Sequence, residues 1–154
     1  MTTQDTAKDA ATVGRIVVGM DGSPASVAAL EWAAGMAGST GALVEVIGTW
    51  EWPTGYGAAV MIPTDYDPAA DTGQLVREAI LSARQHHPDV GFVPLVVEGH
   101  PTTVLVDASR GAELLALGSR GHGEVGGLLL GSVTEHCAAR AHCPVLVVRD
   151  RPGG

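Results

Sequence analysis

Short apolar runs alternate with helix-like stretches along most of the chain. The runs are too short for helices and rich in valine, leucine and isoleucine, which is typical of strands covered on both faces. They lie at residues 15–20, 43–50, 90–97, 114–117 and 145–148. Apolar or alanine-rich helical spacing predicts helices between them, from Pro24 to the glycines at 38–41, around residues 75–87, from Pro101 through Ala108, and over residues 133–141.

This alternation predicts an α/β fold, a single-domain doubly wound parallel sheet of five strands in the order 3-2-1-4-5 with helices on both faces. Pro94 places the third strand at an edge of the sheet, where a missing N–H does least harm. The uniformly apolar last strand is expected at the other edge, which invites pairing. We expect one domain over residues 14–150, after a flexible leader of residues 1–13.

Residues that favour turns follow two of the predicted strands. Asp21 comes directly after the first, and Gly118 directly after the fourth. In doubly wound sheets, ligands bind beyond the carboxyl ends of the strands, where the strand order reverses. The two strands that flank this reversal are the first and the fourth, so we expect a binding site there.

The glycine-rich stretch after residue 117 has the features of an anion site. Glycines can adopt positive φ angles and allow a ligand to approach the backbone closely. Ser132 and Glu135 have the spacing of a capping box, which predicts a helix beginning at Ser132. Because the N–H groups and dipole of a helix N-terminus attract negative charge, this stretch is predicted to hold the phosphates of a nucleotide.

Charge excludes several classes of partner. The 154 residues have a net charge of −8, which argues against nucleic acid and anionic membranes. The single lysine, Lys8, lies in the polar leader. No apolar run approaches the roughly 18 residues that span a bilayer, and residues 1–11 lack the apolar core of a signal peptide. We therefore expect a cytoplasmic protein in which Cys137 and Cys143 are reduced thiols.

Three glycine motifs compete for the stretch. The P-loop needs Gly-Lys-Ser/Thr and is excluded, because the folded body has no lysine. The dinucleotide fingerprint matches at Gly121, Gly123 and Gly126. A true fingerprint follows the first strand and opens its helix at once, whereas this match follows the fourth strand and its helix starts only at about Ser132. We therefore treat the match as an accident of the glycine-rich composition. The third pattern, Gly-x2-Gly-x9-Gly-Ser/Thr, is met by Gly118, Gly121, Gly131 and Ser132.

With this spacing the chain resembles the universal stress protein family, specifically its ATP-binding branch, over residues 14–149. Further matching positions are the opening Val17–Ser23, the turn Gly99-His100-Pro101 and the closing Cys143–Arg149. The resemblance implies ATP, with magnesium, as the ligand. It also implies a homodimer through the last strand, Val145–Val148, a regulatory protein partner, and a role in stress tolerance or growth arrest.

The same resemblance assigns residues to parts of the nucleotide. Gly19 and Asp21 are expected near the adenosine end, with the backbone near Thr49 at the edge of the adenine. Ribose and phosphates are expected within the loop of Gly118, Ser119, Arg120, Gly121, His122 and Gly123. The following helix is expected to donate to the phosphates from Gly131, Ser132, Val133 and Thr134. The chain departs from the family pattern at Glu113, where Asp is frequent, and at Gly48, which is smaller than the usual residue.

Several of these residues have a second interpretation. Asp21 is also a suitable cap for the next turn or helix, and Arg120 either pairs with a phosphate or lies in solvent. Contiguous His-Cys pairs lack the spacings of zinc sites and are not expected to bind metal; they are His136-Cys137 and His142-Cys143. The aromatic residues of segment 50–66 either cover the pocket or form a surface or dimer contact.

A dedicated phosphotransfer enzyme requires more positive charge around the reacting phosphate than this chain offers. Asp21 is the only nearby carboxylate, and it could position a magnesium–phosphate complex. We therefore expect an ATP-binding regulatory protein with at most slow hydrolysis. The alternatives are an ATP-hydrolysing or adenylating enzyme on the same sheet and a dimeric scaffold without nucleotide.

Overall fold

The computed structural model describes residues 13–53, 62–121 and 130–150. These residues form one parallel sheet in the order β3-β2-β1-β4-β5 together with four helices, which confirms the predicted fold class. The elements in chain order are β1 (Arg15–Gly19), α2 (Pro24–Thr40), β2 (Leu43–Trp50), α3 (Pro68–His86), β3 (Phe92–Glu98), α4 (Pro101–Ala108), β4 (Leu114–Gly118), α5 (Ser132–Arg140) and β5 (Val145–Val148).

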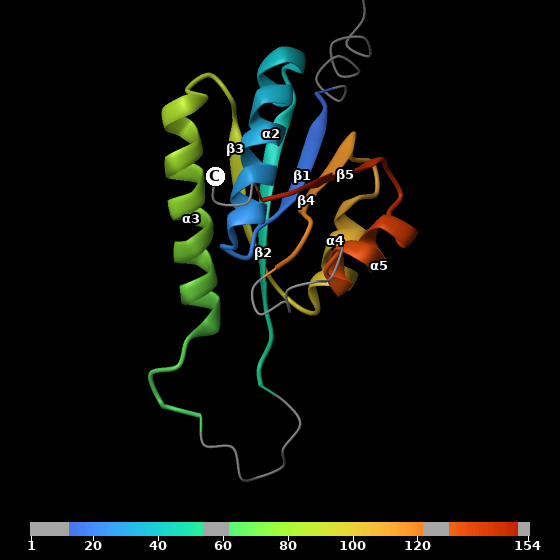
Figure 1. The fold of residues 1–154 in the computed structure, drawn as a ribbon. Helices are drawn as coiled ribbons and strands as arrows, with labels where there is room; N and C mark the ends of the chain where they lie inside the picture. The colour runs from blue at the N-terminus through green and yellow to red at the C-terminus, as the bar shows by residue number, and fades with distance from the viewer. Residues whose placement is uncertain (1–12, 54–61, 122–129, 151–154) are drawn as a thin grey trace, which may run out of the picture.

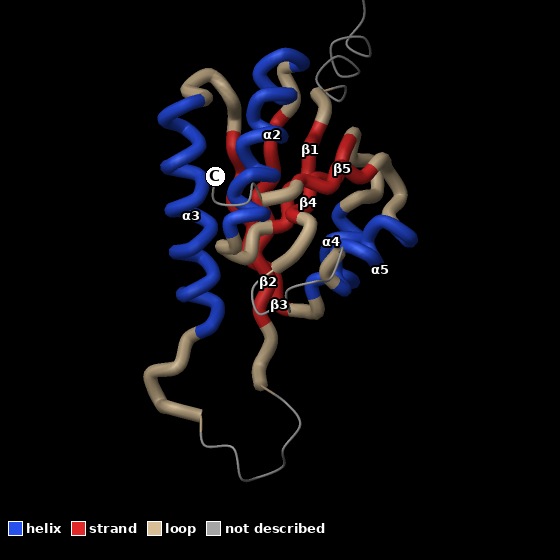
Figure 2. The backbone as a smooth tube through the Cα atoms, in the orientation of Figure 1, coloured by secondary structure: helices blue, strands red, loops and turns tan. Residues whose placement is uncertain are grey.

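Helices cover both faces of the sheet. Figures 1 and 2 show α2 and α3 on one face and α4 and α5 on the other. Each face has its own apolar core: Val18 and Val44 pack in the core under α2 and α3, whereas Val17 and Leu115 pack in the core under α4 and α5. Neighbouring residues of one strand therefore enter opposite cores, which explains why the strands read as continuous apolar runs.

Helix α2 begins and ends where its sequence predicts. The Ser23 hydroxyl accepts a hydrogen bond from the N–H of Ser26 (3.2 Å), and Gly41 ends the helix with a φ of +79°. The alanines on its inner face are fully buried, so the helix backbone lies close to the sheet. They are Ala29, Ala33, Ala34 and Ala37.

Helix α3 begins earlier than its apolar spacing predicts. Its first residue is Pro68, and the Asp67 carboxylate accepts a hydrogen bond from the N–H of Ala70 (3.0 Å). The apolar spacing starts only at Leu75, because the first turns carry small and polar residues. The cap, rather than the apolar face, sets the beginning of this helix.

The two edges of the sheet differ in their hydrogen-bonding groups. Val44 N–H donates to Gly91 O and Gly99 N–H donates to Trp50 O, so the odd-numbered residues of β3 bond to β2. Pro94 is even-numbered and turns its nitrogen to the free edge, which confirms the predicted edge position. At the other edge, Leu115 N–H donates to Pro144 O and Ser119 N–H donates to Val148 O. The N–H of Val147 therefore faces the free edge of β5.

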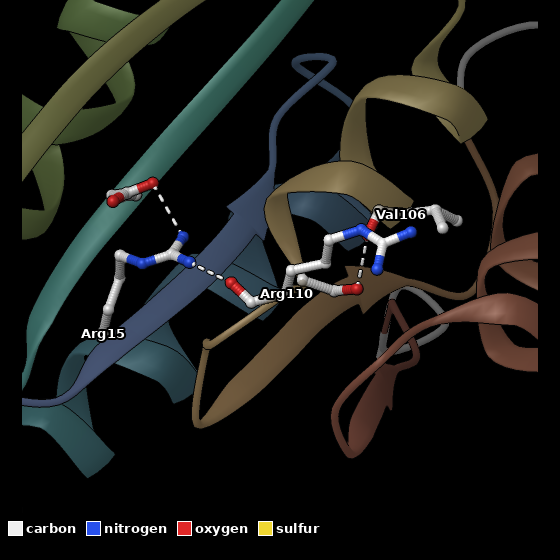
Figure 3. Close-up of polar contacts among 5 residues, drawn as sticks. Arg15, Val106 and Arg110 are labelled. Atoms are coloured by element: carbon white, nitrogen blue, oxygen red, sulfur yellow. Dashed lines mark hydrogen bonds and ion pairs between the residues drawn. The ribbon is translucent and has the colours of Figure 1, made fainter.

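The strand ends opposite the predicted site are tied together by an arginine. Arg15 donates to the Glu45 carboxylate on β2 (3.1 Å) and to the carbonyl oxygen of Arg110, which follows α4 (2.7 Å) (Figure 3). These contacts lie at the amino end of β1, so this guanidinium stabilises the fold away from the carboxyl ends of the strands. Within the described ranges, no helix has both the length and the apolar character needed to cross a bilayer.

Candidate functional site

A cavity of about 340 Å³ lies at the carboxyl ends of β1, β2 and β4. Its volume is within the range of small-molecule sites, and it lies where the strand order reverses. Residues from five stretches of the chain line it: Gly19, Met20, Asp21, Ser23, Ser26, Ile47, Thr49, Pro101, Leu105, Leu117, Gly118, Arg120, Gly121, Gly131, Val133 and Thr134.

Most of the predicted site residues line this cavity. Ser119 is buried and Ser132 is exposed, and neither is among the lining residues. His122 and Gly123 lie outside the described residues. The structure therefore gathers nine of the predicted residues around one space: Gly19, Asp21, Thr49, Gly118, Arg120, Gly121, Gly131, Val133 and Thr134.

The turn after β1 is bonded to the glycine loop after β4. An Asp21 carboxylate oxygen accepts from the N–H of Ser23 (2.9 Å), so Asp21 does stabilise the local turn. The Ser23 hydroxyl in turn donates to the carbonyl oxygen of Arg120 (3.4 Å). These bonds fix the two walls of the cavity relative to each other. The Asp21 carboxylate and the Arg120 residue remain exposed at its mouth.

The two described glycines of the loop, Gly118 and Gly121, serve close packing rather than positive φ. A Cβ atom added to Gly118 would lie 2.6–2.7 Å from atoms of Ala25 and Ser26 at the start of α2. A Cβ atom on Gly121 would lie 2.5 Å from an Asp21 carboxylate oxygen. The expectation of positive φ is wrong for Gly118, Gly121 and Gly131, since positive φ among the described glycines occurs elsewhere.

Helix α5 starts without the predicted capping box. Its N-cap is Gly131, and Ser132 is its first helical residue. Within the described residues, no side chain accepts a hydrogen bond at this cap. The Gly131 N–H instead donates to Ser119 O (2.8 Å), which pulls the helix start against the end of β4 and leaves Ser132 one position too late to cap.

The Thr134 hydroxyl has a structural partner. It is buried and donates to the carbonyl oxygen of Gly118 (2.7 Å), which ties α5 to the end of β4. The Glu135 N–H donates to Gly131 O (2.9 Å), the first intrahelical bond of α5. The N–H groups of residues 132–134 precede that bond and point out of the helix start.

One wall of the cavity is apolar, and sequence reasoning did not identify it. Ile47, Leu105 and Leu117 belong to β2, α4 and β4 and meet at the cavity through the core under α4 and α5. A signal was available for two of them. Ile47 is the strand partner of Gly19 at the end of β1, Leu117 is next to the end of β4, and both share the parity of Val17 and Leu115 on the same face. Gly48 has the opposite parity and faces Thr72 and Val76 of α3. Its small size therefore accommodates α3 and does not shape the cavity.

The described aromatic residues of segment 50–66 do not line the cavity, and Tyr56 lies outside the described residues. Trp50 and Tyr66 each contact Trp52 instead. Cys137 and Cys143 are free thiols, as expected, and burial raises the pKa of Cys137 to about 11. Burial also raises the pKa of Cys143, against the opposing charge of Arg15. Across the described ranges, no three His, Cys, Asp or Glu residues gather as metal ligands.

Similar proteins were found by sequence and by structure. A universal stress protein of Mycolicibacterium smegmatis is 33% identical over 137 residues, which cover 88% of this chain and 46% of that protein. The chain thus spans about half the length of the curated relatives it matches. A universal stress protein solved in complex with cAMP is 26% identical, with a TM-score of 0.68, covering 90% of this chain and 98% of the other.

A second solved structure shows the same fold at lower identity. The universal stress protein UspA from Lactobacillus plantarum is 20% identical, with a TM-score of 0.70, covering 88% of this chain and 97% of the other. The family model described as the universal stress protein family matches residues 12–149, which include all the described strands and helices and all of the described cavity-lining residues. By fold, by sequence and by the extent of that match, the chain belongs to the universal stress protein family.

Proposed function

We propose that this chain is a regulatory protein of the stress response that binds ATP in the cavity at the carboxyl edge of its sheet. The observation that carries the proposal is the gathering of Asp21, Thr49 and the glycine motif around one cavity. The related universal stress protein that was solved in complex with cAMP supports an adenine nucleotide as the ligand. ATP, rather than another adenine nucleotide, is the finer part of the proposal.

The two sides of the cavity suit the two ends of a nucleotide. The apolar wall of Ile47, Leu105 and Leu117 offers a surface for the adenine ring, beside Thr49. The helix start of α5 lies on the polar side, where its dipole favours phosphate. The Gly131 N–H and the Thr134 hydroxyl already have protein partners. The phosphate donors that we propose are therefore the backbone N–H groups of residues 132–134.

Magnesium fits the proposed site through one carboxylate. Asp21 is the single carboxylate among the described lining residues, and it stands exposed beside Gly121. Mg²⁺ bound with a nucleotide is commonly held by one or two carboxylates together with phosphate oxygens. We propose that Asp21 holds the ion, which would neutralise phosphate charge. The Ser23 N–H keeps that carboxylate oriented.

We propose binding with slow turnover or none. Arg120 is the single cationic side chain among the described lining residues, and it is exposed. Stabilising a phosphoryl transition state takes several positioned positive charges in a water-excluded site. ATP occupancy would then act by altering the surface around the cavity that a regulatory partner contacts. The cytoplasm is the compartment that we propose for this role.

We also propose a homodimer through β5. The N–H of Val147 faces the free edge, and Val145 and Val147 are only half-buried. An unpaired apolar edge strand favours pairing with another strand. On the opposite edge, Pro94 has no N–H to offer.

The test of the ATP proposal starts with the protein as purified. Denaturation followed by ion-exchange analysis of the supernatant would detect nucleotide carried through purification. Calorimetry on nucleotide-free protein would then compare ATP, ADP, AMP and cAMP, with and without magnesium. ATP with magnesium is expected to bind most tightly. Absence of bound nucleotide together with absence of heat for all four would contradict the proposal and favour a scaffold, whereas rapid turnover of ATP would favour an enzyme.

A further inference from the structure

Three aromatic rings pack together where β2 ends and the chain leads into α3. The ring centroids of Trp50 and Trp52 are 5.4 Å apart with an edge-to-face angle of 87°. Those of Trp52 and Tyr66 are 6.1 Å apart at 58°. Such contacts hold the rings in fixed orientations. We call Trp50, Trp52 and Tyr66 the aromatic cluster.

The aromatic cluster lies at the end of β2, and its Trp52 and Tyr66 rings are open to solvent. In Figure 1 the end of β2 and the stretch before α3 extend beyond the sheet at the foot of the picture. Trp52 is 46% exposed and Tyr66 is 37% exposed, whereas Trp50 is half-buried. None of the three rings lines the candidate nucleotide cavity. Contiguous exposed apolar side chains of this size are typical of interaction surfaces.

The surroundings of the aromatic cluster are acidic. Glu51 lies between the two tryptophans in sequence, Asp65 and Asp67 flank Tyr66, and Glu98 is the strand partner of Trp50. All four carboxylates are exposed, and none forms an ion pair with another described residue. From residue 16 to residue 76 the chain contains no lysine or arginine. No cation of this stretch therefore neutralises the cluster.

From this combination we infer that the aromatic cluster is a docking surface for a peptide segment that carries arginine side chains. The face of an indole or phenol ring attracts a cation, and guanidinium groups also stack on such rings. The surrounding carboxylates attract the same cations and repel nucleic acid and anionic membranes. A compact ammonium ion would gain the charge attraction but little of the stacking, which is why we commit to arginine.

The test uses a fluorescently labelled short peptide of alternating arginine and serine, titrated with the full-length protein and followed by anisotropy. Binding is expected to wild type, and Trp52→Ala is expected to weaken it about tenfold, because ring stacking and the cation–π attraction are lost together. The matched control is Trp32→Ala: Trp32 is 62% exposed on α2, outside the aromatic cluster, so the affinity should not change. Tyr66→Ala is the second variant, and its affinity should fall in the same direction.

Further arms separate stacking from simple charge attraction. The same peptide with lysine in place of arginine should bind more weakly, and spermine should compete poorly. Equal binding of the peptide to wild type and to both ring variants would overturn the inference, as would equal binding of the lysine peptide or displacement by spermine at matched concentration. Circular dichroism of Trp52→Ala and Tyr66→Ala should match wild type, which reports that the variants are folded without relying on the nucleotide proposal. If wild type binds ATP, calorimetric titration of ATP into Trp52→Ala should match it, because the aromatic cluster does not line the cavity.

Discussion

Gly118, the last residue of β4, lies close against the start of α2. A Cβ atom there would lie 2.6–2.7 Å from backbone and side-chain atoms of Ala25 and Ser26. These atoms belong to the N-terminus of α2 and cannot easily move away. We therefore expect Gly118→Ala to lower the free energy of unfolding by about 1–3 kcal/mol, the usual cost of overpacking. Urea denaturation followed by circular dichroism measures it. Weaker nucleotide binding by this variant would then reflect a displaced helix as much as a lost contact.

Gly38 provides the matched control for that substitution. It is exposed within α2, and an added Cβ would approach only Val90, at 3.7 Å. Alanine in a helix interior is favoured over glycine by about 0.5–1 kcal/mol, so Gly38→Ala should stabilise the protein slightly. A larger loss of stability at Gly38 than at Gly118 would contradict the close-packing explanation.

Asp21 combines a structural hydrogen bond with a charge, and one substitution separates them. Asp21→Asn retains an oxygen that can accept from the Ser23 N–H, so stability should change by less than about 1 kcal/mol. If Asp21 holds magnesium with the nucleotide, the variant should bind ATP with magnesium about tenfold more weakly. Binding of ATP without magnesium should be unchanged or stronger, because a negative charge is removed. Calorimetry measures the affinity for ATP with and without magnesium. If magnesium changed the affinity equally in wild type and Asp21→Asn, the proposed role of Asp21 would be refuted.

Single residues differ in how readily sequence reveals their place. Asp21 and the glycine motif could be predicted as neighbours, because polar and glycine positions after parallel strands meet at one edge, whereas Thr49 was placed with them by the family resemblance. Leu105 could not be predicted there, since an apolar helix residue looks the same in sequence whether it lines a core or a cavity. The sequence also does not reveal why residue 118 is a glycine. Its close neighbour lies far back in the chain, and local patterns do not report such approaches.

At the scale of elements, the two helix starts beside the cavity are built differently. Ser23 caps α2 through a bond from the Ser26 N–H, whereas Ser132 is the first residue inside α5 and is exposed. Ser23→Ala should therefore cost about 1 kcal/mol of stability, as expected for loss of a cap. Ser132→Ala should cost less than about 0.5 kcal/mol, because alanine is well tolerated inside a helix. The two variants form a matched pair in urea denaturation.

If Ser132→Ala lowered stability more than Ser23→Ala, the result would support the predicted capping box at Ser132. The box was a reasonable expectation, because Ser132 and Glu135 have its spacing, but tertiary bonds moved the helix start by one residue. The early start of α3 has a related cause. Its cap, Asp67, precedes the first periodic apolar residue, Leu75, by two turns. Element types could be predicted from periodicity, while boundaries depended on caps and on contacts with distant segments.

At the scale of the whole molecule, the topology could be predicted because local and long-range preferences agree. Apolar strands alternating with helices leave few right-handed arrangements, and Pro94 removes the third strand from the interior of the sheet. The aromatic cluster was foreseen only as a set of residues in a long loop, either covering the pocket or forming a surface. Its separation from the cavity depends on the parity of Trp50, which turns to the opposite face of β2 from Thr49.

The edges of the sheet make the proposed dimer testable with a substitution that leaves internal bonds intact. The N–H of Val147 faces the free edge of β5 and takes no part in the ladder with β4. Val147→Pro would remove this donor, just as Pro94 lacks one on β3. Light scattering coupled to size exclusion is expected to show a dimer for wild type and a monomer for Val147→Pro. On β3, Val96 also directs its N–H to a free edge, so Val96→Pro is the matched control and should remain dimeric. A monomeric wild type would contradict the proposed dimer, and dissociation by Val96→Pro alone would place the interface elsewhere than β5.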